Sequence, residues 1–71
     1  MQKWEYQELV VELDSKLEWF WRDTHESLRV VKTEKRLTQM GREGWELVSA
    51  YTQNGSTYTN AFYYIFKRPL P

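Results

Sequence analysis

Residues 45–67 have the sequence WELVSAYTQNGSTYTNAFYYIFK, and this stretch decides the fold. Asn54-Gly55, near its middle, is a strong β-hairpin signal, because both residue types tolerate the positive φ angles of a two-residue turn. β-Branched and aromatic side chains, which favour strands, are frequent on both sides of this turn. We therefore predict antiparallel strands at 45–53 and 57–67, with Pro69 ending the second strand.

A two-residue turn pairs residue 51 with residue 58 and residue 47 with residue 62, which sorts the hairpin side chains into two apolar faces. One helix covers only one face of a small sheet. The apolar face that the helix leaves uncovered must then be covered by residues 14–32, by another subunit or by a ligand, because monomers rarely expose large apolar patches. The more aromatic face comprises Trp45, Leu47, Tyr51, Tyr58, Phe62, Tyr64 and Phe66, and the other comprises Val48, Ala50, Ala61, Tyr63 and Ile65.

The residues before the hairpin predict a helix and a further strand. Residues 34–43 form the helix, and Gly44 follows as its C′ residue, because glycine adopts the left-handed cap conformation without strain. We expect Gly41, in the last turn, to allow close approach of the helix to the sheet. Residues 3–13 alternate apolar side chains on both faces, which indicates a central strand.

The sequence of residues 14–32 is compatible with several structures. Trp19-Phe20-Trp21 can add a strand or hairpin to the sheet. The spacing of Val30, Leu37 and Met40 allows one helix from about 25 to 43, whereas a shorter helix capped by Thr33 leaves 26–32 extended. We expect a single α+β domain over 1–71, with one main helix and a three-stranded antiparallel sheet, four-stranded if 14–32 contributes. The expected element order is β-α-β-β.

Composition narrows the classes of function. The 71 residues include ten basic and ten acidic side chains and no cysteine, so disulfides and thiolate metal sites are excluded. A core this small contributes little to the stability of the folded chain, and subunit association can add to that stability. Residues 1–26 carry a net charge of −4 and 27–71 a net charge of +4, which favours packing of one half on the other. No apolar run predicts a membrane span or signal peptide, and we expect a cytoplasmic protein.

No catalytic or metal-binding pattern stands out. His25 is the single histidine, and its neighbours Asp23 and Glu26 form a weak ligand set that is typical of a solvated turn. We expect no enzyme activity, no cofactor and no metal. If 25–43 is helical, then Arg29, Lys32 and Arg36 share one stripe and form an anion-binding candidate.

Three pieces of the chain resemble one known family. They are Lys3-Trp4-Glu5-Tyr6, the run Met40-Gly41-Arg42-Glu43-Gly44-Trp45-Glu46-Leu47-Val48-Ser49, and Tyr64-Ile65-Phe66-Lys67-Arg68-Pro69-Leu70. In this order they resemble the small bacterial and phage family catalogued as "domain of unknown function 4177". The resemblance implies a compact β-α-β-β domain and no reaction, since the family has no assigned activity.

The leading hypothesis is a small accessory domain that self-associates, as a dimer or higher oligomer, through an aromatic sheet face. A second is binding or sequestration of a nucleotide-like anion, which would suit a phage protein; a protein partner also stays open. A third is single-stranded nucleic-acid binding, which the zero net charge disfavours. The expected interface residues are Trp45, Tyr58, Phe62, Tyr64, Phe66, Trp19 and Trp21.

Overall fold

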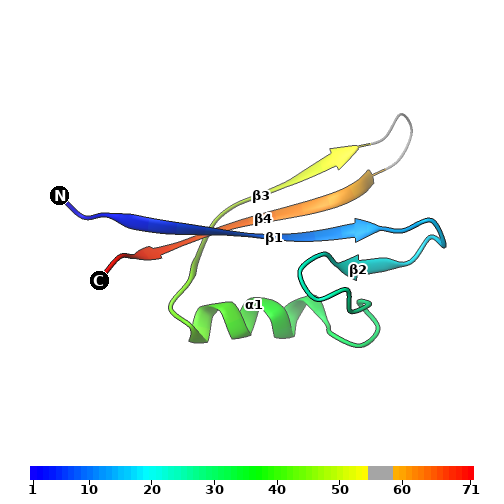
Figure 1. Cartoon of the computed structure of the whole chain (residues 1–71), viewed down its shortest axis with the longest axis horizontal. Helices are drawn as coiled ribbons and strands as arrows, with labels where there is room; N and C mark the ends of the chain where they lie inside the picture. Colours follow the sequence, from blue (N-terminus) through cyan, green and yellow to red (C-terminus); the bar gives the residue numbers. More distant parts are fainter. Residues whose placement is uncertain (55–58) are drawn as a thin grey trace.

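The computed structural model describes residues 1–54 and 59–71 (Figure 1). Over these residues the element order is β-β-α-β-β, and four antiparallel strands form one sheet in the order β2-β1-β4-β3. The expected β-α-β-β order with three strands is therefore wrong. The elements are β1 (Trp4–Leu13), β2 (Trp19–Trp21), α1 (Thr33–Arg42), β3 (Glu46–Asn54) and β4 (Thr59–Pro69).

The additional strand, β2, follows from a tight turn after β1. The Asp14 carboxylate accepts hydrogen bonds from the backbone N–H groups of Lys16 and Glu18, at 2.8 and 2.9 Å. Leu17 takes a positive φ of 61°. The chain therefore reverses, and Trp19–Trp21 pairs with the end of β1. Because the chain forms β2 and then turns up to residue 32, one helix from 25 to 43 does not form.

Helix α1 lies close to its predicted bounds, with Lys32 at the N-cap position and Thr33 as the first helical residue. Gly44 has a φ of +89°, which confirms its predicted role just after the helix. The prediction for Gly41 is wrong, because a Cβ added there would meet no atom within 4 Å. The sheet does not approach the helix closely at Gly41.

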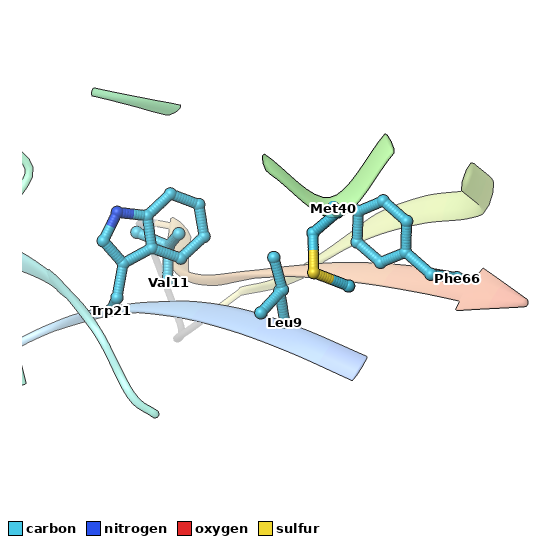
Figure 2. Packing of buried hydrophobic residues seen from close by; sticks show 5 residues of the cluster. All are labelled: Leu9, Val11, Trp21, Met40 and Phe66. Atoms are coloured by element: carbon cyan, nitrogen blue, oxygen red, sulfur yellow. The ribbon is translucent and has the colours of Figure 1, made fainter. Parts of the chain in front are cut away.

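The core lies between α1 and one face of the sheet, here called the helix face. Its buried side chains are Leu9, Val11, Trp21, Met40 and Phe66, surrounded by half-buried Trp19, Leu28, Val31, Leu37, Trp45 and Tyr64. Figure 2 shows Met40, from α1, beside Leu9 and Phe66, with Trp21 next to Val11. The indole N–H of Trp21 donates to the backbone oxygen of Val31 at 3.1 Å, which ties the segment before α1 to this core.

The hairpin register differs from the predicted one. Tyr51 lies opposite Tyr63, and Leu47 lies opposite Phe66. A β-bulge between Leu47 and Ser49 places one extra residue in β3, and side chains beyond it exchange faces. Tyr51 therefore leaves the predicted aromatic face for the opposite one, here called the open face. Gly55 and Tyr58, on which the predicted turn and one face residue depend, lie outside the described residues.

Candidate interaction surface

Strand β3 forms one edge of the sheet, and all nine of its residues are exposed. Leu47, Val48 and Tyr51 each leave about half of their surface in contact with solvent, at 48%, 50% and 49%. Natural edge strands are usually protected by lysine, by proline or by short length. Residues 46–54 contain neither residue type, and Glu46 is their one charge. The edge is long and poorly protected, although its bulge is one protective feature.

At the opposite side of the sheet, the chain itself closes the outer side of β2. The backbone N–H of Trp21 donates to the oxygen of Glu26 at 2.8 Å, and the N–H of Leu28 donates to the oxygen of Trp19 at 3.1 Å. An isolated bridge joins Phe20 to Ser27 between them. The outer side of β2 therefore already has backbone partners. Within residues 1–54 and 59–71, β3 has a neighbouring strand on one side only along its whole length, and the same holds for Trp4–Val10 of β1, beyond the reach of β2.

The open face carries paired aromatic side chains. The rings of Tyr51 and Tyr63 stack with centroids 4.8 Å apart and planes 3° from parallel. The Tyr63 hydroxyl donates to Oε1 of Gln53 at 2.7 Å, which orders the end of this stack. Partial desolvation, followed by the nearby Glu8 carboxylate, raises the pKa of the Tyr51 phenol above the ordinary tyrosine value. The phenol is therefore neutral at pH 7, and its hydroxyl lies 3.5 Å from Glu8.

A second aromatic contact lies on the same face, at the start of β1. The ammonium of Lys67 lies 4.2 Å from the centroid of the Trp4 ring, a distance typical of a cation–π interaction. Trp4 is 38% exposed, and the neighbouring Tyr6 is 64% exposed. The open face therefore keeps aromatic surface along its length, whereas α1 covers the other face.

Most of the predicted interface residues belong to the core of the single chain. Trp21 and Phe66 are buried, while Trp19, Trp45 and Tyr64 are half-buried around them. Phe62 is 36% exposed and packs against Trp19 with ring centroids 5.2 Å apart. The chain's own helix and the loop before it therefore cover this face. Sequence reasoning missed the exposure of Tyr51, because a bulge in β3 decides which way the hairpin side chains point. It also missed the exposure of Trp4 and Tyr6, which lie on β1.

The predicted basic stripe is not formed, because its condition, a helix over 25–43, is not met. Arg36 lies in α1, pairs with Asp23 and places its guanidinium 5.3 Å from the centroid of Trp21. Arg29 and Lys32 precede the helix and are exposed. His25 stacks on Phe20, and among the described residues no group of His, Cys, Asp and Glu could hold a metal ion.

Arg68 joins the three segments that carry the family resemblance. Its guanidinium lies 4.2 Å from the centroid of Trp45 and pairs with Glu5. One of its amino groups also donates to the backbone oxygen of Glu43, at 2.9 Å, beyond the last turn of α1. The start of β1, the end of α1 and the end of β4 therefore meet around one side chain.

Residues 4–69 match the model of the family described as Domain of unknown function (DUF4177). The chain belongs to this family. The match confirms the resemblance drawn from the sequence and extends it across β2 and α1. No curated protein and no solved structure matches the chain. Over the described residues of this DUF4177 domain, no helix is long and apolar enough to cross a membrane.

The motif shared with the family has a structural explanation in this DUF4177 domain. Gly44 supplies the positive φ that ends α1, and Trp45 then packs against the core beneath Arg68. The backbone N–H of Trp45 also donates to the oxygen of Met40 at 3.0 Å, which closes the end of the helix. These residues shape the turn from helix to strand. The family description assigns no activity.

Proposed function

We propose that this DUF4177 domain is a non-catalytic interaction module that works as a homodimer, with its subunits joined at the β3 side of the sheet. The observation that supports this is the amount of surface left exposed. The chain has 5431 Å² of accessible surface, whereas a compact monomer of 8.7 kDa exposes about 4,700 Å². The excess of about 700 Å² is close to the ~800 Å² that each partner buries in a standard interface.

The shape of the chain supports the same proposal. The radius of gyration is 13.6 Å, against about 11 Å for a compact domain of this length. Helix α1 lies on the β1 and β2 side of the molecule, and β3 lies at the far border (Figure 1). The helix therefore leaves β3, with its half-exposed Leu47, Val48 and Tyr51, without a neighbour on its outer side, and a second subunit would supply that neighbour.

Solution mass tests the proposal. We expect wild-type protein at micromolar concentration to have twice the 8.7 kDa chain mass in sedimentation or light scattering. Val48→Lys should reduce the mass to one chain, because a lysine on an edge strand opposes strand pairing. The matched control is Val30→Lys, since Val30 is 71% exposed in the loop before α1 and lies off this edge.

Circular dichroism should show that both variants keep the wild-type fold, so that a change of mass reports association rather than unfolding. A wild-type mass of one chain across this concentration range overturns the homodimer. Loss of the dimer in both variants would place the contact elsewhere and contradict the assignment to β3.

A further inference from the structure

We propose that the two subunits join by antiparallel pairing of β3 with β3 of the second copy, centred on Tyr51, so that two four-stranded sheets become one continuous sheet. The inference rests on the proposed homodimer and adds its geometry. In an antiparallel strand, alternate residues direct their N–H and C=O groups away from the existing neighbour. The outer side of β3 therefore presents a row of backbone groups that a second strand can pair with.

The backbone partners of β2 disfavour a contact of β3 with β2 of another copy. Pairing of β3 with β2 of another copy would use two different surfaces, and such a head-to-tail contact can repeat into a filament. Glu26 and Leu28 already occupy the outer backbone groups of β2. Pairing of β3 with β3 uses the same surface on both copies. It is therefore a two-fold contact that closes on itself.

The regular part of β3 sets the centre of the ladder. Bulges interrupt the pairing with β4 before Ser49 and after Gln53. The undistorted segment is thus Ser49–Gln53, whose midpoint is Tyr51. A ladder centred there places Ser49 opposite Gln53 of the second copy and brings the two Tyr51 side chains together on the open face. The Tyr51–Tyr63 stack of each subunit then continues across the two-fold axis.

The charges of β3 are compatible with this arrangement. Like charges directly opposite each other destabilise a pair of strands. Glu46 is the one charged residue between 46 and 54. Because the strands run antiparallel, the two Glu46 side chains lie at opposite ends of the shared ladder. The centre contains polar, small and aromatic side chains, which pair without a charge penalty.

Engineered cysteines test the register, because the chain contains no cysteine of its own. Opposite residues of antiparallel strands have Cα atoms about 4.5–5.5 Å apart, within reach of a disulfide. Tyr51→Cys should therefore form a disulfide-linked dimer under mild oxidation. Ser49→Cys and Gln53→Cys should each fail alone, since each residue lies about 14 Å from its own copy. A mixture of these two variants should cross-link.

The mixed experiment keeps the test valid if replacing Tyr51 weakens the dimer. Val30→Cys measures the background of random collisions, because Val30 is exposed and lies away from β3. A two-chain mass without a Tyr51→Cys link and without a mixed Ser49→Cys and Gln53→Cys link overturns the strand pairing and leaves the homodimer standing. A one-chain mass for the wild type overturns both proposals.

Discussion

At the scale of single residues, two glycines three positions apart in the family motif have different roles. Gly44 has a φ of +89°, a conformation that residues with a Cβ rarely adopt. Gly41 lies inside α1 with a normal helical backbone and open space where a side chain would be. The backbone conformation requires a glycine at position 44, whereas Gly41 only raises the conformational freedom of the unfolded chain.

Alanine substitutions at these glycines should therefore change stability in opposite directions. We expect Gly44→Ala to lower the free energy of unfolding by about 1 kcal/mol or more, because alanine is strained at this φ. We expect Gly41→Ala to raise it by about 0.5–1 kcal/mol, since alanine is the better helix former. Urea unfolding followed by circular dichroism measures both. Equal effects of the two substitutions would contradict the assignment of different roles.

At the scale of elements, α1 begins without a side-chain cap. Lys32 occupies the N-cap position with an extended backbone, φ −64° and ψ 145°, and makes no capping hydrogen bond. A positive charge at this end also opposes the helix dipole. The helix therefore depends on its contacts with the core, mainly through Leu37 and Met40, and its start is open to improvement.

Lys32→Ser should stabilise the domain by about 1 kcal/mol, because the serine hydroxyl can accept a hydrogen bond from an N–H of the first turn. The matched control is Lys35→Ser, which removes the same charge from an exposed position within α1. It should cost about 0.3 kcal/mol through lower helix propensity. Thermal unfolding at one protein concentration separates them, with a gain for Lys32→Ser of about 4–8 °C. A gain from both substitutions would indicate a general charge effect rather than a cap.

Two features at this scale, the strand β2 that the sequence left open and the register of β3 that it predicted wrongly, have specific causes. β2 has three residues, too few for an alternating pattern, and it forms because the Asp14 turn brings it beside β1. The bulge near Val48 adds one residue to β3, and nothing in the local sequence marks it. It lets Leu47 face Phe66 under the helix while Tyr51 faces Tyr63 on the open side.

At the scale of the whole molecule, ion pairs join the acidic first half to the basic second half. Arg36 pairs with Asp23, and Arg68 pairs with Glu5, which agrees with the opposite net charges of the two halves. Such partly exposed pairs stabilise weakly. The packing of tryptophan and methionine beneath α1 is the larger contribution, and a second subunit would add to it.

A homodimer should melt at a temperature that depends on protein concentration, because association stabilises the folded state by mass action. A tenfold increase in concentration should add about 1.4 kcal/mol per dimer. This corresponds to a rise of roughly 3–6 °C for a folding unit of this combined size. Val48→Lys should melt at one temperature at all concentrations, and Val30→Lys should follow the wild type. A wild-type melting temperature that does not depend on concentration is the contradicting result.

Local sequence was enough to predict the helix near 34–43, its end at Gly44, the strand over 3–13, the two hairpin strands and the family. These features rest on local periodicity and on residues with special backbone freedom, which act over a few positions. The tertiary structure alone decided the path of 14–32, the hairpin register and which aromatic side chains stay exposed. Those depend on pairing between strands distant in sequence, where one extra residue turns the following side chains to the other face.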